Sequence, residues 1–170
     1  MAETPQTPQG EAGAQQATPP RLMIQTQYIK DLSFENPRAP RGMEAGQARP
    51  EITVRIDVRT QSQGSDRHEV ALHLNVEAKI EQETAFVLEL TYAGIFGLMN
   101  IPQESLQPIL LIEAPRLLFP FARRIVADAT RDGGYPPLMI DPIDFVALYR
   151  RRQQQAQEAV GQSVGDPTVS

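Results

Sequence analysis

The sequence predicts an α+β fold in which a four-stranded antiparallel sheet has helices packed on one face. Before residue 100, four stretches alternate apolar and polar side chains, the pattern of strands with one buried face. Short polar turns join three of these stretches, as expected for antiparallel neighbours. Beyond residue 100 the apolar side chains recur at helical spacing. Strands that precede helices are typical of an α+β protein whose helices cover one face of the sheet.

The first strand is predicted over 22–34, where apolar side chains occupy most even positions and Lys30 breaks the pattern. The even positions, which include Thr26 and Tyr28, are therefore expected to face the core. Prolines and glycines interrupt the next segment, 35–50, which predicts a loop. A structureless connection of this length is often functional or mobile.

Three further strands are predicted, over 51–59, 70–80 and 86–92. Each alternates apolar with polar side chains, and the polar turns 61–66 and 81–83 separate them. Together with the first strand they form the predicted sheet, with one covered face and one face open to water.

Helices are predicted in the second half of the chain. A short piece interrupted by proline covers 101–113, and Pro115 starts the chain toward a longer helix. Pro120 either kinks that helix or lies in its first turn, because proline lacks the backbone N–H that a helix interior needs. Gly133 is expected to end it, and Asp141 to cap a last helix. The apolar positions of the longer helix include Leu117, Leu118, Phe121, Ile125 and Val126.

The 170 residues are expected to form one domain between two disordered tails. The tails, 1–20 and 153–170, are rich in Gln, Ala, Pro, Gly and Ser and carry almost no large apolar side chains, whereas 21–152 forms the domain. Most of the net charge of −5 comes from acidic residues in the tails. Inside the domain, 69–113 carries a net charge of −6 and 116–152 a net charge of +3.

Composition argues against several classes of function. The chain has no cysteine, so it has no disulfides or thiolate metal sites, and this fits the reducing cytoplasm. His68 and His73 are the only histidines, and their spacing does not place them on one face of a strand or helix. Carboxylates on a flat sheet lack the pocket that acid–base catalysis requires. We therefore expect a protein that is not an enzyme and uses no cofactor or metal.

Two kinds of partner are also unexpected. No apolar run approaches the roughly 18 residues of a membrane span, and no signal peptide is evident, so we expect no membrane insertion. The charge pattern does not favour nucleic acid, because basic side chains are not interleaved with aromatic ones.

Acidic side chains gather on the open face of the predicted sheet. Asp31, Glu35, Glu77 and Glu89 all fall at outward positions, and Val87 lies near Glu89. Such charges either form an ordinary solvated surface or make a docking surface for a basic partner.

Large apolar side chains also occur in segments that glycine and proline are expected to keep irregular. These segments are the loop around Met43, residues 94–102 and residues 135–140. Their side chains either close the ends of the core or line an open apolar groove, in which flexible Met and Leu side chains adapt to varied partners.

The chain contains three longer motifs, which are YIKDLSFENP followed by AP at 28–40, ETAFVLEL followed by AGIF at 83–96, and LLFPFARRIVADATRDGGYPPLMIDPIDFVALY at 117–149. They resemble motifs of SecB, the bacterial protein-export chaperone family. The likeness extends in consistent order over about 22–152.

The resemblance implies a dimer of dimers, a homotetramer in which the long helices lie between two sheet layers. It also implies a chaperone that binds unfolded precursor proteins without ATP and delivers them to the SecA motor. By that resemblance, the contact with SecA falls on Asp31, Glu35, Val87 and Glu89. The client-binding groove falls on Met43, Tyr135, Leu138, Phe145, Leu148 and Tyr149.

Two segments depart from the family pattern. The loop at 41–49 lacks bulky aromatic side chains, and the C-terminal tail is only weakly acidic. The main alternative is a SecB-like chaperone dedicated to a single client, such as an antitoxin.

Overall fold

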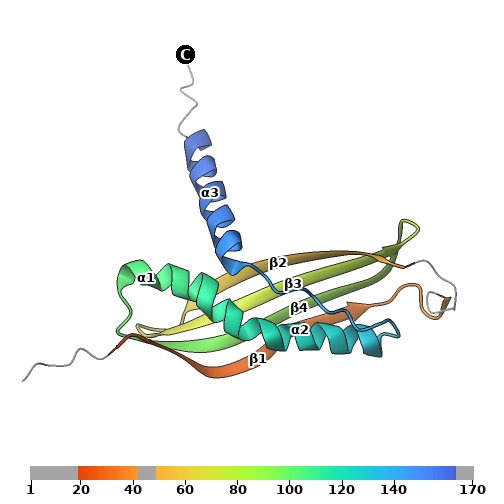
Figure 1. Cartoon of the computed structure of the whole chain (residues 1–170), viewed down its shortest axis with the longest axis horizontal. Coiled ribbons are helices and arrows are strands. Elements are labelled where there is room, and N and C mark those ends of the chain that lie inside the picture. The colour runs from red at the N-terminus through yellow and green to blue at the C-terminus, as the bar shows by residue number, and fades with distance from the viewer. Residues whose placement is uncertain (1–18, 42–48, 164–170) are drawn as a thin grey trace, which may run out of the picture.

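Four long strands form a single antiparallel sheet in the computed structural model, which describes residues 19–41 and 49–163 (Figure 1). In spatial order the sheet is β1-β4-β3-β2, so that β1 and β2 are its edges. The strands are β1 (Arg21–Glu35), β2 (Glu51–Ser62), β3 (Arg67–Ile80) and β4 (Glu83–Met99). The predicted four-stranded antiparallel sheet is confirmed.

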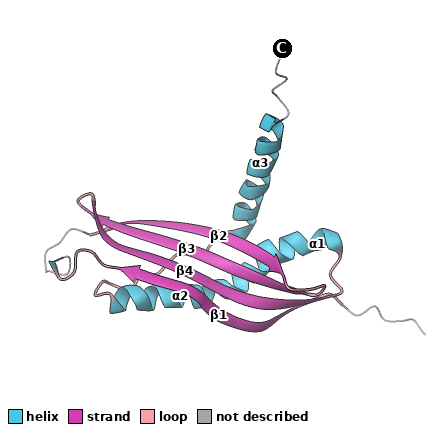
Figure 2. Ribbon diagram, turned by 180° about the vertical axis from the view of Figure 1, so that it is seen from behind, coloured by secondary structure: helices cyan, strands magenta, loops and turns pink. Residues whose placement is uncertain are grey.

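Helices lie against one face of this sheet, as predicted. A short helix α1 (Gln103–Pro108) leads through one π-helical turn, η2 (Ile109–Glu113), into the long helix α2 (Ala114–Asp132). Seen from behind, the sheet lies in front of α1 and α2, and no helix of the described residues crosses its other face (Figure 2). The last helix, α3 (Phe145–Ser163), projects away from the sheet beyond β2 (Figure 1).

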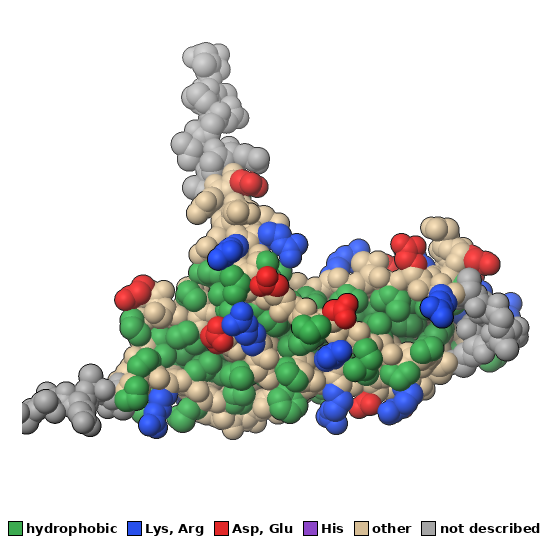
Figure 3. Space-filling view, viewed as in Figure 1, with side chains coloured by type: hydrophobic (Ala, Val, Ile, Leu, Met, Phe, Trp, Pro, Cys, Tyr) green, Lys and Arg blue, Asp and Glu red, His purple; other side chains and the backbone are tan. Residues whose placement is uncertain are grey.

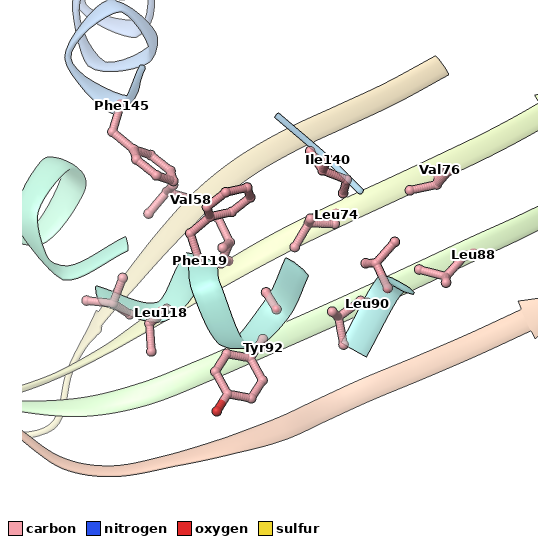
Figure 4. Close-up of a cluster of buried hydrophobic side chains, with 14 of the residues drawn as sticks. Val58, Leu74, Val76, Leu88, Leu90, Tyr92, Leu118, Phe119, Ile140 and Phe145 are labelled. Carbon is pink, nitrogen blue, oxygen red and sulfur yellow. The ribbon is translucent and has the colours of Figure 1, made fainter. Parts of the chain in front are cut away.

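The core lies between the two central strands and α2. Inward apolar side chains of β3 and β4, among them Leu74, Leu88 and Leu90, are almost completely buried (Figure 4). Burial of each such side chain stabilises the fold by about 1.5–3 kcal/mol. Helix α2 comes close to the sheet at Gly94, where an added Cβ would lie 3.0 Å from the Cδ2 atom of Leu118.

Strand β1 departs from the predicted alternation because it contains two irregularities. Its pairing with β4 shifts by one residue after Ile24 and again after Ile29. Residues opposite each other on neighbouring strands share a face. Ile29 therefore faces the helices with its partner Tyr92, while Thr26 and Tyr28 face outward. Our prediction that these two face the core was wrong, because each β-bulge adds one residue and changes the phase of the alternation.

Two boundaries in the middle of the chain also differ from the predictions. The segment 94–102 is not irregular over its first part, because β4 continues to Met99 and pairs there with both β1 and β3. Hydrogen bonding on both sides outweighs the poor strand propensity of its glycines. Helix α2 begins with Pro115 in its first turn and runs through Pro120, so Pro120 does not begin it. It ends at Gly133, as predicted.

Helix α3 begins later and extends further than predicted. Asp144, and not Asp141, caps it, because its Oδ1 atom accepts a hydrogen bond from the backbone N–H of Ala147 at 3.0 Å. We expected 153–163 to be disordered. The helix instead continues through this segment, because Gln, Ala and Glu are good helix formers. The rest of that predicted tail, and residues 1–18 of the other, lie outside the described residues. None of the described helices combines the length and the apolar character needed to cross a membrane.

Candidate functional site

The four residues predicted to contact a partner lie together on the open face of the sheet. On β1 and β4, Glu35 is opposite Val87, and Asp31 is opposite Thr91. Glu89 lies on β4 between these two pairs. We refer to Asp31, Glu35, Val87 and Glu89 as the outer acidic face. Strand pairing fixes the spacing of its carboxylates, so the face offers a defined pattern of negative charge.

The carboxylates of the open face differ in their partners. Glu89 accepts a hydrogen bond from the Nδ2 atom of Asn75 at 2.8 Å, and Glu77 forms an ion pair with Lys79 at 3.1 Å. Within the described residues, Asp31 and Glu35 have no ion-pair partner. Their exposed carboxylates are available to a basic partner.

A buried carboxylate lies next to the outer acidic face. The side chain of Glu69, on β3, accepts hydrogen bonds from the hydroxyl of Tyr28 at 2.5 Å and the ammonium of Lys30 at 2.6 Å. The bond from Lys30, with that from Tyr28, holds the pKa of Glu69 below its usual value, although burial opposes this shift. The hydrogen bond that Tyr28 donates to Glu69 raises the pKa of Tyr28 to about 12. Alternation alone did not predict this cluster, whose one signal in the sequence is the break in the pattern at Lys30.

Two of the six residues predicted to line a client groove lie in the core. The ring of Tyr135 packs 4.8 Å from that of Phe86, and its hydroxyl is 3.1 Å from the Oδ1 atom of Asn36. Phe145 is 1% exposed and points toward Phe119, with 6.2 Å between the ring centroids (Figure 4). Tyr135 and Phe145 therefore contribute to stability. We predicted that they line the client-binding groove, but both side chains are buried in the core.

The other predicted groove residues are half-buried where the structure describes them. Leu148 and Tyr149, on α3, border a hollow of about 330 Å³ between α3, η2 and β2. Leu138 lies away from it, before α3, and its backbone N–H donates to the hydroxyl of Thr130 at 2.9 Å. Met43 lies outside the described residues. We refer to this space as the α3 hollow; its lining residues are Ile56, Asp57, Val58, Leu111, Leu148, Tyr149, Arg151, Arg152 and Gln155.

The α3 hollow combines apolar walls with basic side chains. Ile56, Val58 and Leu111 supply apolar surface, and the guanidinium of Arg152 donates to the backbone carbonyl of Val58 at 2.5 Å. This bond occupies one carbonyl of the edge strand β2 and ties α3 to the sheet. The hollow can accept apolar side chains of an extended peptide.

Helix α2 carries large apolar side chains that remain partly exposed. Leu117 and Phe121 are each 44% exposed, and the ring of Phe121 stacks on that of Tyr92 at 6.3 Å. A space-filling view shows hydrophobic side chains scattered widely across this helix-bearing face (Figure 3). Leu117 and Phe121 are four residues apart on α2, so their side chains lie on neighbouring turns and offer apolar surface that another protein chain could cover.

Comparison with known sequences gives a consistent result. The family described as "Preprotein translocase subunit SecB" matches residues 15–156. The protein-export protein SecB of Parvibaculum lavamentivorans is 52% identical over 150 residues, which cover 88% of this chain and 89% of that protein. The protein-export protein SecB of Maricaulis maris is 47% identical over 174 residues, which cover 100% of this chain and 99% of that protein.

A solved structure has a similar fold. It is a SecB-like chaperone of Mycobacterium tuberculosis in complex with a ChAD peptide from the HigA1 antitoxin. The TM-score is 0.61 with 16% sequence identity, and the match covers 72% of this chain and 91% of that one. At this identity the likeness supports the fold.

Proposed function

Because this chain belongs to the SecB family, we propose that it is an ATP-independent chaperone that binds unfolded precursor proteins and delivers them to the SecA motor. The family match over 15–156 carries the assignment to preprotein export. Relatives that match most of the chain are named protein-export proteins, so a chaperone dedicated to one antitoxin is not favoured.

Client binding is proposed for the α3 hollow and its surroundings. An unfolded chain exposes apolar side chains that the native protein buries, and Leu148 and Tyr149 offer half-buried apolar surface to them. A protein that binds the unfolded form but not the native form raises the unfolded population by mass action. Several weak sites on one assembly would add avidity along a single client chain.

SecA docking is proposed for the outer acidic face. Asp31 and Glu35 are exposed, and Glu89 is held by Asn75, so the negative charge has a fixed position. Charge complementarity with a basic segment of SecA would speed association and set specificity. The client and SecA could then bind at the same time, because the α3 hollow and the outer acidic face involve different parts of the molecule.

Assembly as a dimer of dimers is proposed through the exposed apolar side chains of α2. Leu117 and Phe121, four residues apart on α2, are each 44% exposed and offer adjacent apolar surface. Pairing α2 with the same helix of a second copy would cover them, which fits the symmetric contacts usual in homo-oligomers.

The proposed chaperone acts in the cytoplasm, where precursors are made, and we expect it to bind clients without catalysis or nucleotide. A delivery assay tests this function. A denatured precursor is diluted into a mixture of SecA, ATP and inverted membrane vesicles, with or without this protein. We expect the protein to increase the fraction of precursor that enters the vesicles. An unchanged fraction, with SecA active on a control precursor, would contradict the proposal.

A further inference from the structure

We propose that Glu69 holds the ammonium of Lys30 away from Asp31 and so preserves the negative charge of the outer acidic face. This inference rests on the proposed docking of SecA at that face. Glu69 is a positioning residue here, because it acts on the docking surface through Lys30.

The backbone of β1 places Lys30 and Asp31 on the same side of the sheet. The pairing of β1 with β4 shifts between Ile29 and Asp31, which leaves Lys30 as the extra residue of a bulge. A bulge re-aims the side chain of its extra residue. Asp31 faces outward opposite Thr91, and Lys30 also points outward, because its ammonium contacts Glu69 on the open face.

Small side chains let Lys30 reach Glu69 across a whole strand. Lys30 is on β1 and Glu69 on β3, with β4 between them. On the open face, the neighbouring strands present Ala93 and Ala71 opposite each other, and these are 0% and 5% exposed. Their methyl groups leave room for the side chain of Lys30 to pass over β4. A larger residue at Ala93 would block this path.

Glu69 is well placed to retain the cation. Its side chain is 11% exposed, and both carboxylate oxygens accept hydrogen bonds, one from Lys30 and one from Tyr28. Hydrogen bonds between charged groups that are partly shielded from water are stronger than those on an open surface. The side chain of Lys30, by contrast, is 48% exposed, so it would remain mobile if Glu69 lost its charge.

The released ammonium would have Asp31 within reach. Lys30, Asp31 and Glu69 border the same hollow of about 510 Å³ on the open face, together with His73 and Thr91. Without the charge of Glu69, the ammonium of Lys30 can move toward the unpaired carboxylate of Asp31. It would then neutralise a group that the basic partner is proposed to contact.

The test is a rescue experiment with purified SecA as the probe. Glu69→Gln keeps the shape of the side chain and its hydrogen bond from Tyr28, and we expect it to weaken SecA binding by about two- to fivefold at low salt. The double variant with Lys30→Met and Glu69→Gln should bind like the wild type, because the competing cation is gone. Equal thermal unfolding of the variants would establish that they are folded.

Two outcomes would overturn the inference. One is wild-type affinity in Glu69→Gln. The other is equal weakening in the single and double variants, which would indicate a general disturbance of the sheet and not a competing charge.

A hexalysine peptide serves as a second probe that does not depend on SecA. If the wild type binds hexalysine but not SecA, the docking proposal fails. If the wild type and the double variant then bind hexalysine more tightly than Glu69→Gln does, the role of Glu69 is still supported. Equal affinities of the three proteins for hexalysine would overturn it.

Discussion

The two faces of the sheet differ in the kind of surface that they offer to a partner. On the open face, strand pairing sets the position of each charged group, and hydrogen bonds such as that from Asn75 to Glu89 fix some of them further. On the helix-bearing side, exposed apolar side chains lie among charged ones and come from helices and their connections, such as Phe121 on α2 and Met139 before α3. A rigid charge pattern suits one defined partner, whereas apolar side chains can adapt to many.

The largest expected effect is a loss of stability on changing Phe145, the residue of α3 that lies in the core. Phe145→Ala should lower the free energy of unfolding by about 3–5 kcal/mol, because it leaves a cavity against Phe119. Tyr149→Ala, at a half-buried position, should cost much less stability and weaken client capture instead. Denaturant unfolding and binding of an unfolded precursor measure the two effects. Loss of capture without loss of stability in Phe145→Ala would show that Phe145 belongs to the client surface.

The second effect concerns assembly through the helix-bearing side. Phe121→Glu should convert the tetramer into a dimer, because it places a charge where a second copy of α2 is proposed to pack. Met139→Glu is the matched control, since Met139 is 59% exposed and lies outside α2. Light scattering distinguishes the species. A wild type that is monomeric at micromolar concentration would contradict the dimer of dimers.

The third effect concerns the open face. Asp31→Lys should weaken SecA binding by about tenfold, because it reverses one of the unpaired charges of the proposed contact. Capture of unfolded chains should be unchanged. Glu104→Lys on α1 makes the same change of charge on the helix-bearing side and should leave SecA binding near wild type. If Asp31→Lys reduced SecA binding and client capture equally, the two surfaces would not be separate.

The smallest effect is a pH dependence at His73. Burial, followed by the charge of Arg59, lowers the pKa of His73 below 6.5. In the range between that lowered pKa and 6.5, the unfolded chain binds more protons than the folded one, so stability rises with pH. His73→Gln should remove a small part of this rise in unfolding measurements. An unchanged pH profile would show that His73 does not contribute.

The sequence was sufficient to predict a strand and its buried face where the alternation of apolar and polar side chains is regular. Strands β2 and β3 were predicted closely, because faultless alternation with one buried face leaves only one way to place them. The same reasoning failed in β1, because a bulge is a property of the pairing between strands and leaves only a weak trace, the misplaced Lys30. The burial of Phe145 and Tyr135 could not be predicted either, since an apolar residue in a helix or turn can lie in the core or line a groove.

The candidate site was predictable in position but not in its supporting contacts. Alternation placed Asp31 and Glu89 outward, and strand pairing brought them together. The hydrogen bonds from Asn75 to Glu89 and from Lys30 to Glu69 depend on neighbours 14 and 39 residues away in the chain. Such pairs become visible only when the register of the sheet is known.

Refolding of a denatured precursor in the absence of nucleotide tests the central proposal most directly. The protein is mixed with a slowly folding precursor as denaturant is diluted, and the recovery of native precursor is followed with time. We expect refolding to slow in proportion to the amount of chaperone, and the held precursor to remain able to fold when released. Refolding at the rate of the free precursor, or a delay that requires ATP, would contradict the proposed function.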